Sequence, residues 1–291
     1  MKNTLYILSA LALASLLAFA CNKAETSESD VVTVNYTVTA PATKAFGEGE
    51  SINTIWYALY KTNGTLVTDF GTVAFNAGSA VCPVTMVRDQ SYKVVFVGLH
   101  YDGQNPVYAI DPAKAAIAMP ATAVANTDKY ELFCTVQDVI KYDGGKTGSA
   151  TLDRIVSQVN FVCTTEDWNA AATLGMTPAQ SAVTLGWVPA SYDILAGAVS
   201  SATQSVDYQR AALSGVTNLL GAAYCFAGSN VSATLKLYPS ETATEPSTIL
   251  EVPVVPVEAN KRTNITGSIM TGTLNYTIGL ETTSTSTDKE I

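Results

Sequence analysis

The feature that most constrains this chain is an alternating run near its N-terminus, residues 31–39, with the sequence V-V-T-V-N-Y-T-V-T. A period of two over this length is typical of a β-strand that buries one face. Threonine and asparagine occupy the other face. The run therefore predicts a strand seated on an apolar core through four side chains: Val32, Val34, Tyr36 and Val38.

The next segment, residues 40–47, reads A-P-A-T-K-A-F-G and combines turn-forming residues with one cation, Lys44. Exposed loops of small and polar residues are preferred sites of proteolytic cutting. A cut here would separate the strand at residues 31–39 from the rest of the chain. We therefore expect this strand to be removable, and we expect the protein to assemble by exchanging β-strands.

The first 21 residues predict an export signal. Lys2 supplies a positive charge, residues 5–20 are almost wholly apolar, and small residues precede Cys21. Residues 17–21, L-A-F-A-C, are similar to the lipobox of bacterial lipoproteins, in which the cysteine carries the lipid. The alternative is an ordinary cleaved signal peptide. The apolar run is short for a helix that must cross ~30 Å of hydrocarbon.

Charge limits the partners of the exported chain. Residues 22–30, N-K-A-E-T-S-E-S-D, predict a disordered tether. Beyond the signal, 15 Lys and Arg (16 less Lys2) stand against 25 Asp and Glu, which gives a net charge of −10. An acidic chain with few charges argues against nucleic acid or an anionic membrane surface as partner.

Short apolar segments separated by turn signals fill most of the remaining chain. Residues 52–61 and 92–99 are apolar on both faces and predict central strands. Residues 250–257 alternate but contain two prolines, which predicts an edge strand. Residues 109–125 predict a loop with one helical turn. Residues 165–167, T-E-D, predict the start of a helix, with acids that complement the helix dipole. Residues 168–182 predict its continuation as a short helix broken at Gly175 and Pro178.

About 270 exported residues exceed one small sandwich, so we predict an all-β fold with two β-sandwich domains in tandem and little helix. The boundary is placed in the glycine-rich residues 141–149. The predicted division is a signal with lipidated Cys21 (1–21), a tether with the removable strand (22–44), an N-terminal sandwich (45–148) and a C-terminal sandwich (149–291).

Four cysteines follow the signal, each in an apolar, strand-like segment. Exported proteins hold disulfides, and four cysteines allow three pairings. Buried free cysteines also pack as small hydrophobes, and we favour this interpretation. The residues concerned are Cys82, Cys134, Cys163 and Cys225.

The sequence is poor in catalytic material, and we expect no enzyme activity, cofactor or metal site. Its one histidine, His100, ends an apolar strand and has no nucleophile motif beside it. Residues 145–147, G-K-T, lack the earlier glycine and the following helix of a phosphate loop. Trp56, Trp168 and Trp187 would line a sugar site or, more commonly, pack within the fold.

Four stretches in order resemble the fimbrillins, or type V pilins, of anaerobic gut and oral bacteria. They are the signal ending at Cys21 and residues 43–47 (T-K-A-F-G), 152–161 (L-D-R-I-V-S-Q-V-N-F) and 261–267 (K-R-T-N-I-T-G). The resemblance implies transthyretin-like sandwiches, no cofactor, and a lipoprotein held in the outer membrane at the cell surface through lipid on Cys21.

The resemblance also implies an assembly mechanism. A trypsin-like surface protease would cut between Lys44 and Ala45, although arginine is commoner at the first position. A C-terminal strand of a neighbouring fimbrial subunit would then fill the vacated groove. We expect the donor at residues 271–280, T-G-T-L-N-Y-T-I-G-L, where one face carries Leu274, Tyr276 and Ile278.

Two other functions remain open at this stage. One is an uncleaved anchor or accessory subunit of a fimbria, which keeps its lipid and its first strand. The other is a surface lipoprotein that binds a glycan or host ligand on the same sandwiches, for which a solvent-facing cluster of Trp and Tyr is expected.

Overall fold

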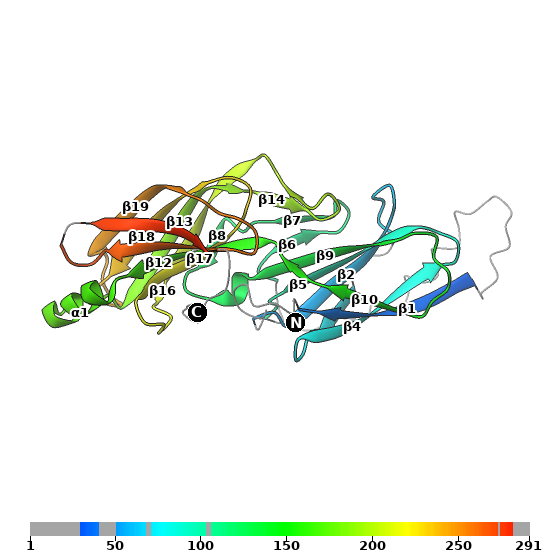
Figure 1. Cartoon of the computed structure of the whole chain (residues 1–291), viewed down its shortest axis with the longest axis horizontal. Coiled ribbons are helices and arrows are strands. Elements are labelled where there is room, and N and C mark those ends of the chain that lie inside the picture. The colour runs from blue at the N-terminus through cyan, green and yellow to red at the C-terminus, as the bar shows by residue number, and fades with distance from the viewer. Residues whose placement is uncertain (1–29, 41–50, 68–70, 103–105, 273, 282–291) are drawn as a thin grey trace, which may run out of the picture.

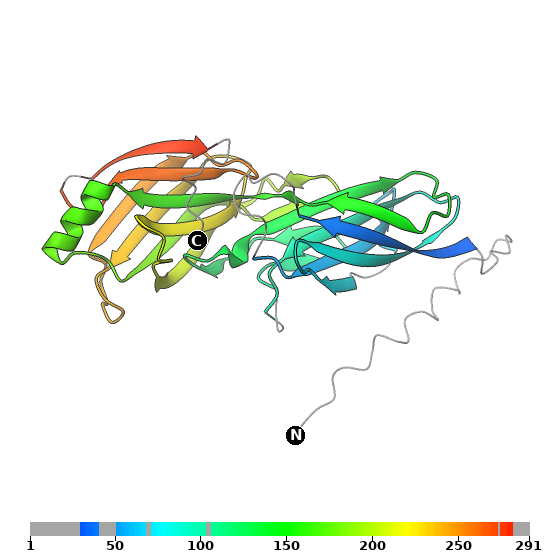
Figure 2. The same cartoon turned by 60° about the horizontal axis from the view of Figure 1, so that its bottom comes forward.

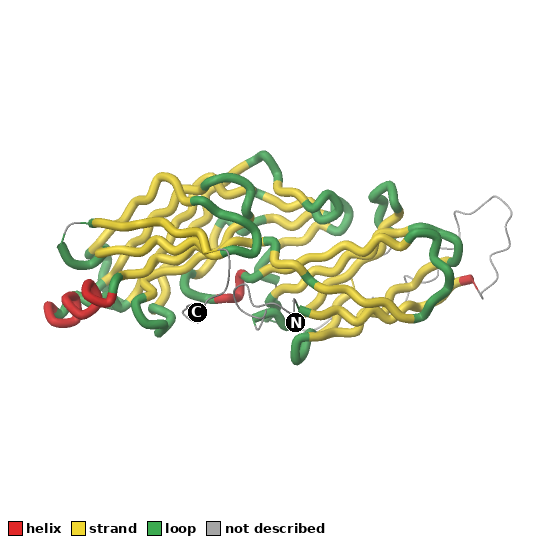
Figure 3. The backbone as a smooth tube through the Cα atoms, in the orientation of Figure 1, coloured by secondary structure: helices red, strands yellow, loops and turns green. Residues whose placement is uncertain are grey.

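The computed structural model describes residues 30–40, 51–67, 71–102, 106–272 and 274–281. Most of these residues lie in β-strands, which confirms the predicted all-β fold (Figure 3). Within the described ranges, no helix is long and apolar enough to cross a membrane.

The first half of the chain forms two layered sheets (Figure 1). In the smaller sheet, β1 (Val31–Thr39) lies between β4 (Ser79–Val87) and β10 (Thr147–Thr151). The larger sheet has the order β11 (Asp153–Arg154), β9 (Leu132–Val139), β5 (Tyr92–Leu99), β2 (Thr54–Lys61) and β3 (Gly71–Ala74).

The second half forms another pair of sheets. One has the order β17 (Leu219–Phe226), β12 (Val156–Cys163), β20 (Arg262–Ser268) and β21 (Asn275–Glu281). The other has the order β19 (Thr248–Val255), β18 (Val231–Tyr238), β13 (Gln180–Pro189), β16 (Thr203–Ala212) and β8 (Thr122–Val124).

The predicted loop at residues 109–125 is wrong, because three short strands form there. A further sheet has the order β15 (Ala198–Val199), β14 (Ser191–Asp193), β7 (Ala116–Ala118) and β6 (Ala109–Asp111). Strands of three residues are too short to show a period. β6 pairs with the adjacent β7, but β7 also pairs with β14 and β8 pairs with β16, both far along the chain. Because β7 and β8 pair with strands of the second half, a division into two separate tandem domains stays a prediction.

Two sequence patterns are confirmed in the sheets. The continuous apolar run of β5 is buried on both sides: Val94 and Phe96 face the core shared with β1, while Val95 and Val97 face the larger core. The proline-containing β19 lies at the edge of its sheet, where a missing backbone donor costs least.

The one α-helix among the described residues is α1 (Thr165–Leu174), at one end of the molecule in Figure 2. Its start is as predicted, with Thr164 as the N-cap. The predicted break at Gly175 is confirmed, because this residue adopts a left-handed conformation with φ 68° and ends the helix. The predicted continuation beyond it to residue 182 is wrong. The strand β13 begins five residues after Gly175.

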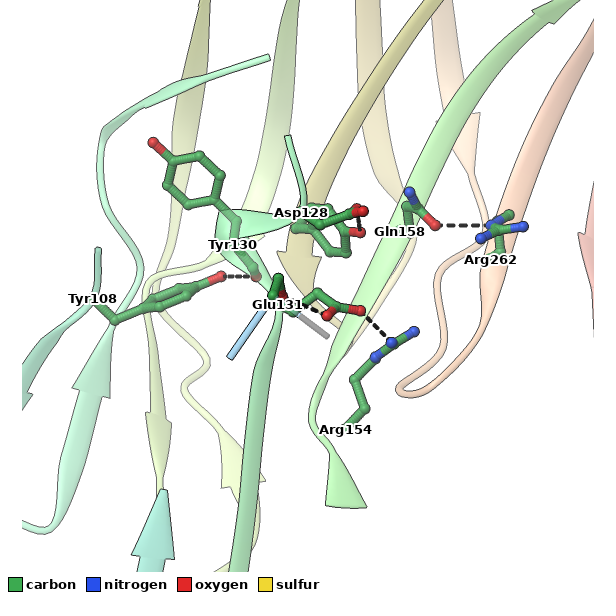
Figure 4. A network of polar contacts seen from close by, with 9 residues as sticks. Tyr108, Asp128, Tyr130, Glu131, Arg154, Gln158 and Arg262 are labelled. Atoms are coloured by element: carbon green, nitrogen blue, oxygen red, sulfur yellow. Dashed lines mark hydrogen bonds and ion pairs between the residues drawn. The ribbon is translucent and has the colours of Figure 1, made fainter. Parts of the chain in front are cut away.

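Buried polar contacts gather where the chain passes from the first pair of sheets to the second (Figure 4). Glu131, before β9, forms an ion pair with Arg154 of β11, and their side chains are only 5% and 3% exposed. Arg262 donates to Gln158 across β20 and β12 at 2.8 Å. Buried charges such as Glu131 and Arg154 are stabilised by an oppositely charged partner, because water does not solvate them there.

Replacing Glu131 with Gln should lower the free energy of unfolding by about 3–5 kcal/mol, because Arg154 then loses its buried ion-pair partner. The matched control is Asp138→Asn, which breaks the exposed pair with Lys93 at 2.8 Å and should cost about 0–1 kcal/mol. Urea denaturation followed by far-UV circular dichroism measures both. Equal effects would contradict a structural role for the buried pair.

Candidate functional site

The first strand is held along both edges and beneath one face. We call its surroundings the β1 seat: β4 and β10 beside it, and the apolar cluster below. The strand β1 runs antiparallel to β4 from Val31 opposite Val87 to Thr39 opposite Ser79. It runs parallel to β10 from Asn35 opposite Thr147 onward. Figure 2 shows β1, in blue, between its two neighbours.

The burial of β1 follows the predicted alternation. Val34, Tyr36 and Val38 are 3%, 7% and 0% exposed, while Val32 is half-buried at the strand's start. They join a cluster to which β4 and β10 of the same sheet and β2, β5 and β9 of the facing sheet all contribute. The ring of Tyr36 lies 5.3 Å from that of Phe96, centre to centre. Burial, helped by Tyr142, raises the pKa of the Tyr36 hydroxyl.

Gly148 of β10 is essential to the β1 seat, and the sequence analysis missed it. A Cβ at Gly148 would lie 2.4 Å from Cε1 of Tyr36, so the glycine leaves the space that the tyrosine ring fills. These two residues are register partners in the parallel pair of β1 and β10. Glycine in a strand often marks such a close approach, and this was the only signal in the sequence.

Replacing Gly148 with Ala should therefore destabilise the protein by about 1–3 kcal/mol, because the methyl group and the Tyr36 ring compete for one space. The change should cost much less in a Tyr36→Ala background, where the ring is gone. Gly279→Ala is the control, since a Cβ there meets nothing within 4 Å. Urea denaturation of the four variants tests the coupling; additive costs would contradict it.

The connection from β1 to β2 passes through the predicted cutting site. Lys44 and Ala45 lie outside the described residues, and processing there stays a prediction, as does lipidation of Cys21. Near the end of this connection, the hydroxyl of Ser51 donates to Glu131 at 2.6 Å. The Nδ1 atom of His100 lies 2.8 Å from the Ser51 carbonyl oxygen, so the one histidine holds this end of the connection.

The predicted donor strand corresponds to β21, which lies at the edge of its sheet and pairs only with β20. It begins later than expected, so Leu274 stands just before its first residue. Leu274 and Ile278 are 47% and 37% exposed, while Tyr276 is half-buried against the larger core. The apolar face of β21 is thus only partly covered.

Two residues secure the start of β21. A Cβ at Gly267 would lie 1.9 Å from the carbonyl oxygen of Asn275, so only glycine permits the pairing there. Asp167 of α1 is 2% exposed, and its carboxylate accepts four hydrogen bonds from the turn before β21. The donors are Ile269 N (2.7 Å), Met270 N (2.9 Å), Thr271 N (2.8 Å) and Thr271 Oγ1 (2.6 Å).

The sequence suggested only that Asp167 complements the helix dipole. No local pattern reveals that its partners lie about a hundred residues later. Burial by itself raises the pKa of the Asp167 carboxyl, but the four hydrogen bonds outweigh burial and hold the pKa below 3.8. Asp167 therefore stabilises the fold in its ionised form.

Because the folded-state pKa of Asp167 lies below its unfolded value of about 3.9, the full contribution of its carboxylate to folding stability is present above that pH. The contribution is lost as the pH falls through the folded-state pKa. Asp167→Asn should lower stability at pH 7 by about 1.5–3 kcal/mol and flatten the acid limb of the stability curve. Urea denaturation from pH 3 to 7 measures this, with Glu166→Gln, on the exposed side of the helix, as control. An unchanged acid limb would contradict the assignment.

The four cysteines are free and buried, which confirms the favoured interpretation over disulfides. Burial raises the pKa of Cys82, Cys134 and Cys225 to about 12, and such thiols are unreactive at neutral pH. Within the described residues, no three His, Cys, Asp or Glu side chains lie together in a way that would hold a metal ion.

The layered sheets define an all-β sandwich protein. The chain belongs to DUF6562, described as a family of unknown function, whose model matches residues 25–288. No curated protein matches it.

Solved structures are also similar to this chain, among them the following three. A candidate cell adhesion protein from Bacteroides uniformis has a TM-score of 0.51 at 8% identity, over 87% of this chain and 98% of its own. A candidate polysaccharide-binding protein from Bacteroides thetaiotaomicron has a TM-score of 0.51 at 9% identity, over 81% of this chain and 91% of its own. A fimbrial assembly protein from Parabacteroides distasonis has a TM-score of 0.48 at 11% identity, over 86% of this chain and 95% of its own. At such identities the likeness is one of fold.

Proposed function

We propose that this chain is a structural, non-catalytic subunit of a cell-surface adhesion fibre, and that subunits join by β-strand exchange after a cut at Lys44. The observation that carries the proposal is the β1 seat. A nine-residue strand is paired on both edges and buried on one face. Its covalent link to β2 runs through residues 41–50, which include Lys44.

The energetics favour replacement of β1 over simple loss. Its three fully buried side chains contribute roughly 1.5–3 kcal/mol each, an upper bound. Backbone hydrogen bonds to both neighbours add to this. The total is comparable with the ~5–15 kcal/mol stability of a whole domain. Without β1, the edges of β4 and β10 and the apolar cluster would be a template for another strand.

The segment at the start of β21 resembles the centre of β1. Residues 34–38 read V-N-Y-T-V, and residues 274–278 read L-N-Y-T-I. In this register, Leu274, Tyr276 and Ile278 of one subunit take the places of Val34, Tyr36 and Val38 in the next. Tyr276 would then lie over Gly148, in the space shaped for a tyrosine ring. Because Leu274 and Ile278 are already partly exposed, moving this strand to another subunit would break few buried contacts.

The comparisons support the surface role at the level of fold. The candidate cell adhesion protein from Bacteroides uniformis has a similar fold over most of both chains. Fibre formation accounts for a removable strand in such a protein. We further propose export as an outer-membrane lipoprotein through Cys21, with a surface protease and other fimbrial subunits as partners.

Treating purified protein with trypsin-like protease should give a ladder of multimers on gels run without boiling. Lys44→Ala should block both the cut and the ladder. Tyr276→Ala should permit the cut but abolish the ladder, because the β1 seat no longer receives its ring. Thr277→Ala is the matched control, since this neighbouring residue is exposed, and it should retain the ladder.

A clean shortened monomer after complete cutting would contradict strand exchange. A ladder that survives Tyr276→Ala would exclude β21 as the donor in the proposed register. The N-terminus of the surface protein separates the two fimbrial roles: Ala45 indicates a fibre subunit, whereas lipidated Cys21 indicates an anchor that keeps β1.

A further inference from the structure

The most strained exposed aromatic residue lies away from the β1 seat. Trp187 of β13 has φ 63°, a conformation that bulky residues rarely adopt, and its side chain is 67% exposed. Trp56 and Trp168 are instead half-buried against the larger core. Strain persists where the surrounding structure imposes it, and it concentrates at ligand-binding positions.

A β-bulge creates this conformation. The pairing of β13 with β16 shifts between Leu185 and Val188, so Trp187 interrupts the regular alternation. Its neighbour Gly186 has no side chain, and a Cβ there would lie 2.5 Å from the Ser232 hydroxyl. The bulge therefore presents the exposed indole ring beside a residue without a side chain, whose space the Ser232 hydroxyl occupies. Bulges next to functional sites commonly redirect a side chain in this way.

A row of polar side chains crosses the same sheet close to Trp187. Thr184 is its centre, three residues before the tryptophan, and it donates to Asp207 at 3.0 Å. The residues beside Thr184 along β13, Val183 and Leu185, are buried, so the row faces away from the core. Register partners define the row across all five strands as Glu251, Thr234, Thr184, Asp207 and Thr122.

The chemistry of this row selects its ligand. Two carboxylates and three hydroxyls offer acceptors to a ligand rich in hydroxyl donors, and the indole offers a flat apolar face. A second copy of this acidic chain, with net charge −9, is poorly matched to two carboxylates. Strands lie ~4.8 Å apart, close to the advance of one sugar unit along an extended glycan.

We propose that Trp187 and the row centred on Thr184 bind a neutral polysaccharide. One pyranose ring stacks its apolar face on the indole, and the hydroxyls of neighbouring sugar units donate to Asp207 and Glu251 or exchange hydrogen bonds with the threonines. A rigid aromatic platform provides contact area at little entropic cost. The proposal does not depend on strand exchange, since the site is complete in the uncut chain.

The test is affinity electrophoresis of the uncut, full-length protein in gels containing α-glucan, β-glucan, mannan, galactan or xylan. Wild type should be retarded by at least one polymer. Trp187→Gly should abolish the retardation, Thr184→Val should weaken it, and Trp187→Phe should retain part of it. Leu174→Ala, which removes a side chain of matched exposure (65%) on α1, should behave as wild type.

Thermal unfolding of Trp187→Gly gives a second readout. Glycine adopts positive φ without strain, so a tryptophan kept for binding predicts a melting temperature raised by roughly 2–4 °C together with lost binding. A lowered melting temperature would indicate a structural role and overturn the proposal. Absence of retardation in all five polymers, or equal retardation of Trp187→Gly and wild type, would overturn it as well, as would a change in oligomeric state caused by Trp187→Gly.

Discussion

The burial of one face of β1 between β4 and β10 is the constraint on which the first half of the molecule depends. Val34, Tyr36 and Val38 complete a core that the other strands leave open. The outer face carries polar residues and the strand's two edges carry the backbone pairing. Losing a strand held this way would cost much of the domain's stability. Its contacts depend on little beyond its residue pattern, so any chain with the same alternation and a tyrosine at the centre satisfies the same contacts.

The other end of the molecule presents the complementary arrangement. The strand β21 has one paired edge and a partly exposed apolar face, and its start is fixed by Asp167 and by the close approach at Gly267. The residues before β21 are thus held by several contacts, whereas β21 itself is paired along one edge. In the proposed fibre, these contacts would fix where each transferred strand starts. The strand, which pairs along one edge in its own subunit, would pair along both edges in the β1 seat of the next subunit.

Adhesion and assembly occupy different surfaces in this view. In the proposed fibre, the β1 seat and β21 would determine how subunits connect. The Trp187 face belongs to the sheet of β13, where a polar row and one strained indole face solvent. A strained backbone conformation lowers stability, and proteins retain such residues mainly where function requires them. A fibre that repeats a weak glycan site along its length gains avidity without any new contact.

The sequence by itself determined the all-β class, the buried face of β1, the two-sided burial of β5, the edge position of β19 and the start of α1, because each depends on a local period or on one residue's backbone chemistry. It did not predict the short strands at residues 109–124, the space at Gly148, the partners of Asp167 or the buried pair of Glu131 and Arg154. Apart from the local pairing of β6 with β7, these depend on contacts between segments tens to more than a hundred residues apart. Only the tertiary structure brings those segments together, since nothing in a single strand's pattern specifies which distant backbone or side chain will lie beside it.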